Sequence, residues 1–151
     1  MARNLRKKYA LSVGLLFVIA SVCRLAYVVE LFCAQVQRDT GAWYWAEYST
    51  FSISDETAKY RLTVAGYCGD ASDAMAAAAF SNWMATGMMF STPDSDSDVC
   101  PDCNCASHSR WWMANCSANH LTRDSTNAIW TSVAGPAVYD VVFSRMLVRL
   151  N

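Results

Sequence analysis

The chain has 151 residues, and 54% of them are hydrophobic, which is enough for one folded domain with a core and excludes a disordered polymer. Its 12 basic and 13 acidic residues nearly cancel, which leaves a net charge of -1. Because binding to nucleic acid needs a concentrated basic face, the sequence predicts no nucleic-acid partner.

The first 23 residues have the layout of a secretory signal. A basic start from Arg3 to Lys8 precedes the apolar run Ala10–Val22, and small residues follow near its end. Arg24 and Glu30 interrupt the apolar stretch before it reaches the roughly 20 residues that span a bilayer. We therefore expect residues 1–23 to be a cleaved signal peptide and the protein to be secreted. The alternative is an uncleaved signal anchor, which would make a type II membrane protein.

The seven cysteines are interpreted through this expected location. The extracellular space is oxidising, so cysteines there predict disulfides, whereas the same number in the cytosol would favour metal or redox chemistry. Cleavage after Cys23 leaves six cysteines, which can all pair. Cleavage after Ala20 leaves all seven and one odd thiol.

After residue 40 the pattern is typical of β-strands. Apolar and polar residues alternate over Tyr48–Ile53 and Lys59–Val64, with Ser54–Thr57 as the expected turn between them. Two glycines in Gly66–Asp70 are expected to break this pattern. The segment Ala137–Leu150 predicts one or two closing strands.

One helix is predicted between the strands and the centre of the chain. The segment Ala71–Met84 is rich in alanine, and Asp70 or Ser72 can cap its N-terminus. Gly87 follows at a position that suits a C-terminal cap.

The stretch from Phe90 to Cys116 concentrates most of the chemistry. Asp94, Asp96 and Asp98 alternate, so their carboxylates can turn towards one point, which suits a hard cation. Two prolines and many small polar residues predict a shaped loop rather than a helix or strand. Four cysteines can pin such a loop by disulfides: Cys100, Cys103, Cys105 and Cys116.

Several segments in this order carry a resemblance to a known family: WAEYSTFSISDETAKYRLTVAGYCGDASDAM, GMMFSTPDSDSD and RWWMANC. From about residue 43 to residue 149 the chain resembles the C-terminal portion of a fibrinogen-related domain of the ficolin and tachylectin type, without its N-terminal half. The resemblance implies an α+β fold class. Residues 30–151 would form a partial, β-rich fibrinogen C-terminal-like domain with short helices and a long calcium loop pinned by disulfides.

The resemblance also implies a calcium ion as the cofactor. In similar domains the second and third aspartates of the loop are side-chain ligands, which here are Asp96 and Asp98. The backbone carbonyl oxygens of Cys100 and Asp102 are the matching candidates for the remaining ligands. One residue inserted before Cys105 leaves the carbonyl assignment open.

The family's second disulfide corresponds to Cys105 and Cys116 in this chain. Cys100 and Cys103 are additional, and they are candidates for a further bridge. A ligand pocket lies beside the calcium loop in similar domains, so the expected ligand-binding residues are Asn115, Cys116, Ser117 and His120. The resemblance further implies a cis peptide bond between Asn115 and Cys116.

The chain departs from the family pattern mainly around this pocket. Ser117 stands where the family has a histidine, and Thr122-Arg123 replaces an Asn-Gly pair. The tyrosine-rich segment that forms a pocket wall is deleted between Arg123 and Asn127. The calcium loop is therefore better retained than the pocket.

Other interpretations of the aspartate loop are less favourable. An EF-hand is excluded, because its sixth position is Val99 instead of glycine and its twelfth is Cys105 instead of glutamate. From spacing alone, a solvated surface turn remains the plain alternative for the aspartates.

The cysteines of the loop also allow two alternatives. The spacing Cys100-x2-Cys103-x-Cys105, with Cys116 and the nearby histidines His108 and His120, can be drawn as a zinc site. The CPDC run is the pattern of a redox pair. Secretion favours disulfides over both.

Three further motifs are interpreted as follows. GxSxG, P-loop and HExxH motifs are absent from the sequence, so we predict no enzyme activity. Of the adjacent Trp111 and Trp112, one is expected in the core and the other near the loop surface, because neighbouring side chains of an extended segment point in opposite directions. The glycosylation sequon Asn115-Cys116-Ser117 is expected to be unused.

The sequence thus predicts a secreted, non-enzymatic, calcium-stabilised recognition module. Its expected action is lectin-like binding of acetylated glycans, as in innate immunity, and its partners are glycans or extracellular proteins. One alternative is a structural or interaction fragment whose exposed sheet edge pairs with another chain, including a second copy of itself. The other is a zinc or redox protein built on the cysteine loop.

Overall fold

The computed structural model describes residues 27–29, 31–76, 83–100, 102–117, 119–122, 128–131 and 138–149. The expected signal peptide, residues 1–23, lies outside this part of the chain. No helix formed by the described residues has the length and apolar character needed to cross a membrane.

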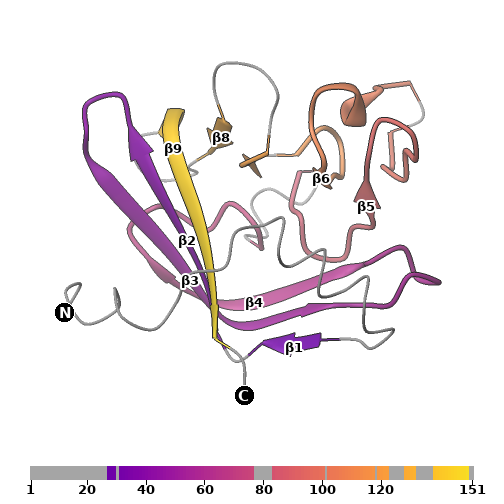
Figure 1. Ribbon diagram of the computed structural model, residues 1–151, viewed down its shortest axis with the longest axis horizontal. Coiled ribbons are helices and arrows are strands. Elements are labelled where there is room, and N and C mark those ends of the chain that lie inside the picture. Colours follow the sequence, from indigo (N-terminus) through magenta and orange to yellow (C-terminus); the bar gives the residue numbers. More distant parts are fainter. Residues whose placement is uncertain are drawn as a thin grey trace.

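Seven strands form one antiparallel sheet, which dominates the molecule (Figure 1). The order across the sheet is β4, β3, β2, β9, β8 and β7, and β1 pairs with the end of β3. The strands are β1 (Tyr27–Val29), β2 (Leu31–Arg38), β3 (Trp43–Ile53), β4 (Leu62–Gly69), β7 (Asn119–His120), β8 (Ala128–Trp130) and β9 (Val138–Arg149).

The last strand of the chain lies in the middle of this sheet. Strand β9 pairs with β2 on one side and with β8 on the other. Its register against β2 shifts by one residue between Gln37 and Arg38, so the strand carries a β-bulge there. Because β9 joins the two halves of the sheet, the C-terminal residues are part of its central support.

The two faces of the sheet differ as the alternation along each strand requires. On one face the core is formed by side chains from β2, β3, β4 and β9, among them Phe32, Tyr48, Leu62 and Met146. On the opposite face lie Gln35 and Arg145, whose side chains hydrogen-bond to each other at 2.5 Å. Among the described residues, the buried core lies on the first of these faces.

The predicted strands are found, but their limits differ from the prediction. The Tyr48–Ile53 pattern belongs to the longer strand β3, and the C-terminal pattern forms the single strand β9. Strand β4 begins only at Leu62, because Lys59 and Tyr60 have φ angles of 55° and 53° and belong to a turn. The strand then continues through Gly66, where a break was expected.

The predicted helix Ala71–Met84 is wrong for the residues that the structure describes. Residues 71–76 and 83–84 form bends and turns, and residues 77–82 lie outside the described part. The Asp73 carboxylate accepts hydrogen bonds from the Tyr48 hydroxyl and the Ala76 backbone N–H, both at 2.9 Å. These contacts with the sheet hold a turn where alanine alone favours a helix.

In the described chain the only helical element is η3, a 3₁₀-helix at Cys105–His108. A second, small sheet consists of β5 (Phe90–Ser91) and β6 (Trp111–Trp112). The fold is therefore β-rich with almost no helix, and the expected α+β class is not supported.

The outer edge of β4 is partly covered. The Leu62 N–H donates to the Met88 carbonyl at 3.0 Å, and the Gly87 N–H donates to the Leu62 carbonyl at 2.7 Å. Further along, the Val64 N–H donates to the Thr86 hydroxyl at 3.0 Å. Residues 86–88 therefore pair with the start of this edge, so the edge of β4 is not fully exposed as the sequence suggested.

Candidate functional site

The loop of interest is closed at its base by the small sheet. Strand β5 pairs with β6 through Phe90 opposite Trp112 and Ser91 opposite Trp111. The Phe90 N–H donates to the Lys59 carbonyl at 3.0 Å, and the Trp112 indole N–H donates to the Tyr60 carbonyl at 2.7 Å. The turn before β4 thus fixes both ends of the loop.

Both tryptophans of β6 are buried, so the expected placement of one near the loop surface is wrong. Trp112 packs edge-on against Phe51 and Phe90, with ring centroids 6.3 and 5.1 Å away. Trp111 lies on the other face of the strand, where its indole N–H donates to the Asn119 side chain. Both faces of this short strand are buried, because other parts of the chain pack against each of them.

The first part of the loop is a tight turn held to its base. Thr92 and Ser95 exchange two backbone hydrogen bonds of 3.1 and 3.0 Å. The exposed Asp94 carboxylate accepts a hydrogen bond from the Thr92 side chain, which keeps the pKa of Asp94 below its ordinary value. Ser97 is buried, and its hydroxyl accepts a hydrogen bond of 3.1 Å from the Lys59 ammonium group.

Asp98 connects the aspartate turn to the cysteine region. Its N–H donates to Oδ1 of the exposed Asp96 at 3.1 Å. Its own carboxylate accepts the Cys100 N–H at 2.7 Å on one oxygen and the Cys105 N–H at 3.3 Å on the other. Asp98 is half-buried and oriented by backbone groups on both sides.

The predicted calcium ligands lie in one loop. The carboxylates of Asp94, Asp96 and Asp98, however, do not gather into one cluster. Among the described residues, the only three candidate metal-ligating side chains whose atoms all lie within 4.8 Å of one another are Cys103, Cys105 and Cys116. The Cys100 carbonyl oxygen already accepts the Cys103 N–H at 3.1 Å, and Asp102 is exposed. The oxygen atoms present suit calcium chemically, since each retains a lone pair beyond its existing hydrogen bond.

Two disulfides close the second part of the loop. Cys105 is bonded to Cys116 and Cys100 to Cys103, with Cα–Cα distances of 4.9 and 5.4 Å, which are within the usual range. All four cysteines of this loop are therefore oxidised, and none is a thiolate ligand for zinc in this state. In β2 and β4, Cys33 is a buried free thiol and Cys68 an exposed one.

The turn after Cys116 differs from the expectation. The described residues contain no cis peptide bond, so the expected cis bond between Asn115 and Cys116 is wrong. Cys116 and Ser117 instead both have a φ of 55°, in the left-handed region. The chain reverses here by two left-handed residues and not by a cis peptide.

The four expected ligand-binding residues do come together at this turn. Ser117 donates its hydroxyl to the carbonyl oxygens of Trp83 and Trp112, at 3.2 and 3.3 Å. His120 is buried, and its Nε2 hydrogen-bonds to the Cys116 carbonyl oxygen. Asn115 alone of the four is exposed, so the face that this turn offers to a ligand is smaller than expected.

Two residues that sequence reasoning did not select help to build the site. Lys59 anchors the loop through Ser97, and Trp83 contacts Ser117 through its carbonyl while 47% of the residue is exposed. Both contacts join residues more than 30 positions apart, at separations of 38 and 34. No local pattern marks such contacts, and Trp83 lies within the segment Ala71–Met84 that was predicted to be helical.

Comparison with known proteins gives one consistent result. The family profile described as "Fibrinogen beta and gamma chains, C-terminal globular domain" matches residues 22–135. The chain is 37% identical over 107 residues to Protein scabrous of Drosophila melanogaster, a match that covers 69% of this chain and 12% of that protein. It is 41% identical over 86 residues to the human fibrinogen gamma chain, covering 50% of this chain and 19% of that one.

Solved structures agree with the sequence relatives. The fibrinogen-like globe domain of human ANGPTL6 superposes with a TM-score of 0.66 at 25% identity, covering 80% of this chain and 56% of that one. A lamprey fibrin D-dimer complexed with the peptide Gly-His-Arg-Pro-amide gives a TM-score of 0.63 at 27% identity, covering 82% and 45%.

The chain thus spans a small part of its curated relatives and about half of each solved chain. The family profile nevertheless covers three quarters of the 151 residues, including strands β1 to β8 and the whole disulfide loop, while strand β9 lies beyond the matched range. The chain belongs to the family of the C-terminal globular domain of the fibrinogen beta and gamma chains.

Proposed function

We propose that this chain is a secreted recognition module, stabilised by calcium and without catalytic activity. Fibrinogen-like domains are typical of non-enzymatic extracellular recognition proteins. The lamprey structure that this chain resembles was solved with a short peptide ligand. These facts support recognition of an extracellular molecule as the role of the fold.

The observation that carries the calcium proposal is the position of Asp98. Its carboxylate is held between the two disulfide-bonded segments by the Cys100 and Cys105 N–H groups, and Asp96 lies beside it. A cation bound by Asp96 and Asp98 would tie together a loop that has little regular secondary structure. Calcium suits these oxygen ligands, because it accepts irregular geometry and carbonyl groups.

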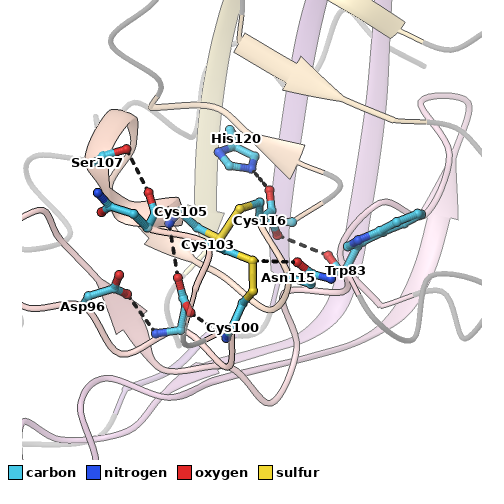
Figure 2. Close-up of a disulfide and its surroundings, with 12 residues drawn as sticks. Trp83, Asp96, Cys100, Cys103, Cys105, Ser107, Asn115, Cys116 and His120 are labelled. Carbon is cyan, nitrogen blue, oxygen red and sulfur yellow. Dashed lines mark hydrogen bonds between the residues drawn. A yellow bond between two sulfur atoms is a disulfide. The ribbon is translucent and has the colours of Figure 1, made fainter.

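The proposed ligand site is the turn next to this loop. Asn115 presents an exposed amide, which can both donate and accept hydrogen bonds, as an acetamido group requires. Trp83 is close by, joined to the turn through Ser117, and its ring can pack on the apolar face of a sugar (Figure 2). An acetylated glycan or an acetylated protein terminus is therefore the proposed ligand.

The test is retention of the folded protein on an acetylated resin in calcium. We expect retention, release by a chelator, and loss of retention in Asn115→Ala and Trp83→Ala. Trp43→Ala is the matched control, since Trp43 is exposed to a similar degree (44%) but lies on the outer face of the sheet. Absence of retention in calcium, or equal retention of all variants, would reject the lectin-like function.

A second function is favoured by the outer face of the sheet. Trp43 and Phe143 are 44% and 53% exposed, and their rings meet edge to face at 5.6 Å. The Arg145 guanidinium lies 5.2 Å from the Trp43 ring. Exposed aromatic and arginine side chains are typical of protein interfaces, so the alternative proposal is an interaction fragment, including self-association.

Sedimentation velocity over a range of protein concentrations tests this alternative for self-association. Self-association through the outer face predicts a rise in sedimentation coefficient with concentration, removed by Phe143→Lys. Substitution of the exposed Val99 by Lys, in the loop, is the control and should leave any association unchanged. A concentration-independent monomer would reject association of two copies.

A further inference from the structure

The two disulfides of the loop lie directly beside each other. The Sγ atoms of Cys103, Cys105 and Cys116 are all within 4.8 Å of one another, although Cys103 belongs to one bridge and the other two to the second. Figure 2 shows the two disulfides, drawn as yellow bonds, next to each other.

We propose that these bridges form a thiol–disulfide exchange site, in which Cys103 passes reducing equivalents from an external dithiol to the Cys105–Cys116 disulfide. Exchange requires a thiolate close to a disulfide sulfur and access for the first reductant. The loop offers both features, at different cysteines.

The Cys100–Cys103 bridge can be reached at both of its cysteines, whereas the Cys105–Cys116 bridge can be reached only at Cys116. Both of its cysteines are partly exposed, and the neighbouring Asp102 and Asn104 are exposed. In the second bridge Cys105 is only 7% exposed. An external dithiol therefore reaches Cys100 and Cys103 more readily than Cys105.

The first step is reduction of this bridge. The external dithiol is oxidised to a disulfide, the Cys100–Cys103 bond breaks, and both cysteines become thiols. In the second step the Cys103 thiol loses its proton and its sulfur attacks Cys116. The Cys103–Cys116 bond forms, the Cys105–Cys116 bond breaks, and the Cys105 thiolate takes up the proton.

Cys116 is the expected target for two reasons. It is partly buried, whereas Cys105 is almost fully buried, so its sulfur is the more accessible of the pair. Cys105 is also only two residues from Cys103, which leaves little freedom to form a bridge of normal geometry. The side-chain oxygen of Asn115 lies 3.4 Å from the Cys103 sulfur and can accept a hydrogen bond from its thiol after reduction.

The exchange changes the surroundings of Asp98. It leaves Cys100 and Cys105 as free thiols, and these are the residues whose N–H groups orient the Asp98 carboxylate. One longer link between Cys103 and Cys116 then replaces the two bridges. Any effect on calcium rests on the proposed calcium site, but the exchange between sulfurs does not.

A matched pair of variants tests the exchange without calcium. Cys100→Ser and Cys103→Ser both remove the same bridge and leave one thiol each, but only Cys103 lies beside the second bridge. Both are made in a Cys68→Ser background, which removes the exposed free thiol of β4. Each protein is incubated with a limiting dithiol, quenched in acid, alkylated with a maleimide and mapped by mass spectrometry.

We expect the Cys103–Cys116 link, with alkylated Cys105, in Cys100→Ser, whereas Cys103→Ser should keep the Cys105–Cys116 bridge. Loss of the Cys105–Cys116 bridge should also be faster in Cys100→Ser, by about tenfold or more. Equal rates together with no Cys103–Cys116 link would overturn the proposal.

The unaltered protein provides a second test if either variant fails to fold. Half an equivalent of dithiol should yield Cys103–Cys116 with alkylated Cys100 and Cys105. Simple opening of the first bridge, with Cys105–Cys116 intact and Cys103 alkylated, would overturn the relay. Because no calcium is present, failure here leaves the calcium proposal untouched, and failure of calcium binding leaves this result valid.

Discussion

Gly66 illustrates how much a single residue in β4 is constrained. Its φ is 72°, and a Cβ atom built on it would lie 2.0 Å from the hydroxyl oxygen of Ser49 on the neighbouring strand. Gly41 has a similar φ of 83° but no atom within 4 Å of such a Cβ. Substituting alanine at Gly41 and at Gly66 therefore separates the energetic cost of the left-handed backbone from the cost of steric overlap.

We predict that Gly41→Ala lowers the free energy of unfolding by about 1 kcal/mol, which is the cost of a left-handed alanine. Gly66→Ala should cost about 2–4 kcal/mol, because overlap with Ser49 adds to that strain. Urea denaturation measures both values. The double variant Gly66→Ala/Ser49→Ala should recover part of the loss, and equal costs for the two glycines would contradict the steric argument.

The two free thiols should react very differently. Burial, and to a smaller degree the negative charge of Glu47, raises the pKa of Cys33 from 9.0 to about 11. A raised pKa keeps the thiol protonated, so little thiolate is present at neutral or mildly alkaline pH. Because the Cys33 thiol ionises more readily in the unfolded chain, the free energy of unfolding is unaffected by this group below pH 9. It falls as the pH rises from 9 towards 11.

We predict that a maleimide at pH 8 modifies the exposed Cys68 completely while Cys33 reacts only after unfolding. Peptide mapping after timed quenching identifies the modified residue. Similar rates for both thiols in the folded protein would show that Cys33 is not buried as described.

At the scale of elements, the base of the loop depends on β6. Trp112 is buried, packs on Phe51 and Phe90, and donates its indole N–H to the Tyr60 carbonyl at 2.7 Å. It therefore joins the small sheet to β3 and to the turn that precedes β4. Removing this side chain should loosen the loop as well as the core.

We predict that Trp112→Ala lowers the free energy of unfolding by about 3–5 kcal/mol, through the lost packing and a cavity. Trp43→Ala, on the exposed face of β3, should cost about 1 kcal/mol, because it loses mainly its contact with Phe143. Urea denaturation followed by circular dichroism compares the two. A loss at Trp43 as large as that at Trp112 would contradict the assignment of the core.

The elements that could be predicted from sequence are those set by local alternation. Tyr48–Ile53 lies within β3, and the segment predicted to form one or two closing strands, Ala137–Leu150, contains β9. The strand ends that depend on contacts between residues far apart in the sequence could not be predicted. Lys59 and Tyr60 alternate like strand residues, yet their carbonyl groups are used by Phe90 and Trp112, which hold them in a turn.

The same distinction applies to the helix and the site. Alanine-rich composition favours a helix after Ala71, but Asp73 bonds to Tyr48 in the sheet, 25 residues away. In the loop, the resemblance identified Asp98 and the cysteines, whereas the burial of His120 and the trans bond at Asn115 follow from packing. Local chemistry was therefore predictable, and its exposure to a ligand was not.

At the scale of the whole molecule, the sheet and the loop have separate roles. The C-terminal strand β9 completes the sheet from within, and the long excursion between β4 and β8 carries the disulfide loop away from it (Figure 1). The loop is attached through short strands and hydrogen bonds, and its two disulfides lie within it. A cation that binds there should therefore stabilise a loop that has little regular structure.

Thermal unfolding with and without calcium measures whether the loop binds such a cation. At calcium concentrations near 100 times the dissociation constant, binding to the folded state adds about 2.7 kcal/mol. For a chain of this length, that corresponds to a rise in Tm of roughly 5–10 °C over the protein in chelator. Asp96→Asn and Asp98→Asn should lose this rise, while Asp94→Asn, outside the proposed ligand set, should keep it. An unchanged Tm in calcium, or an equal rise in all three variants, would contradict the account.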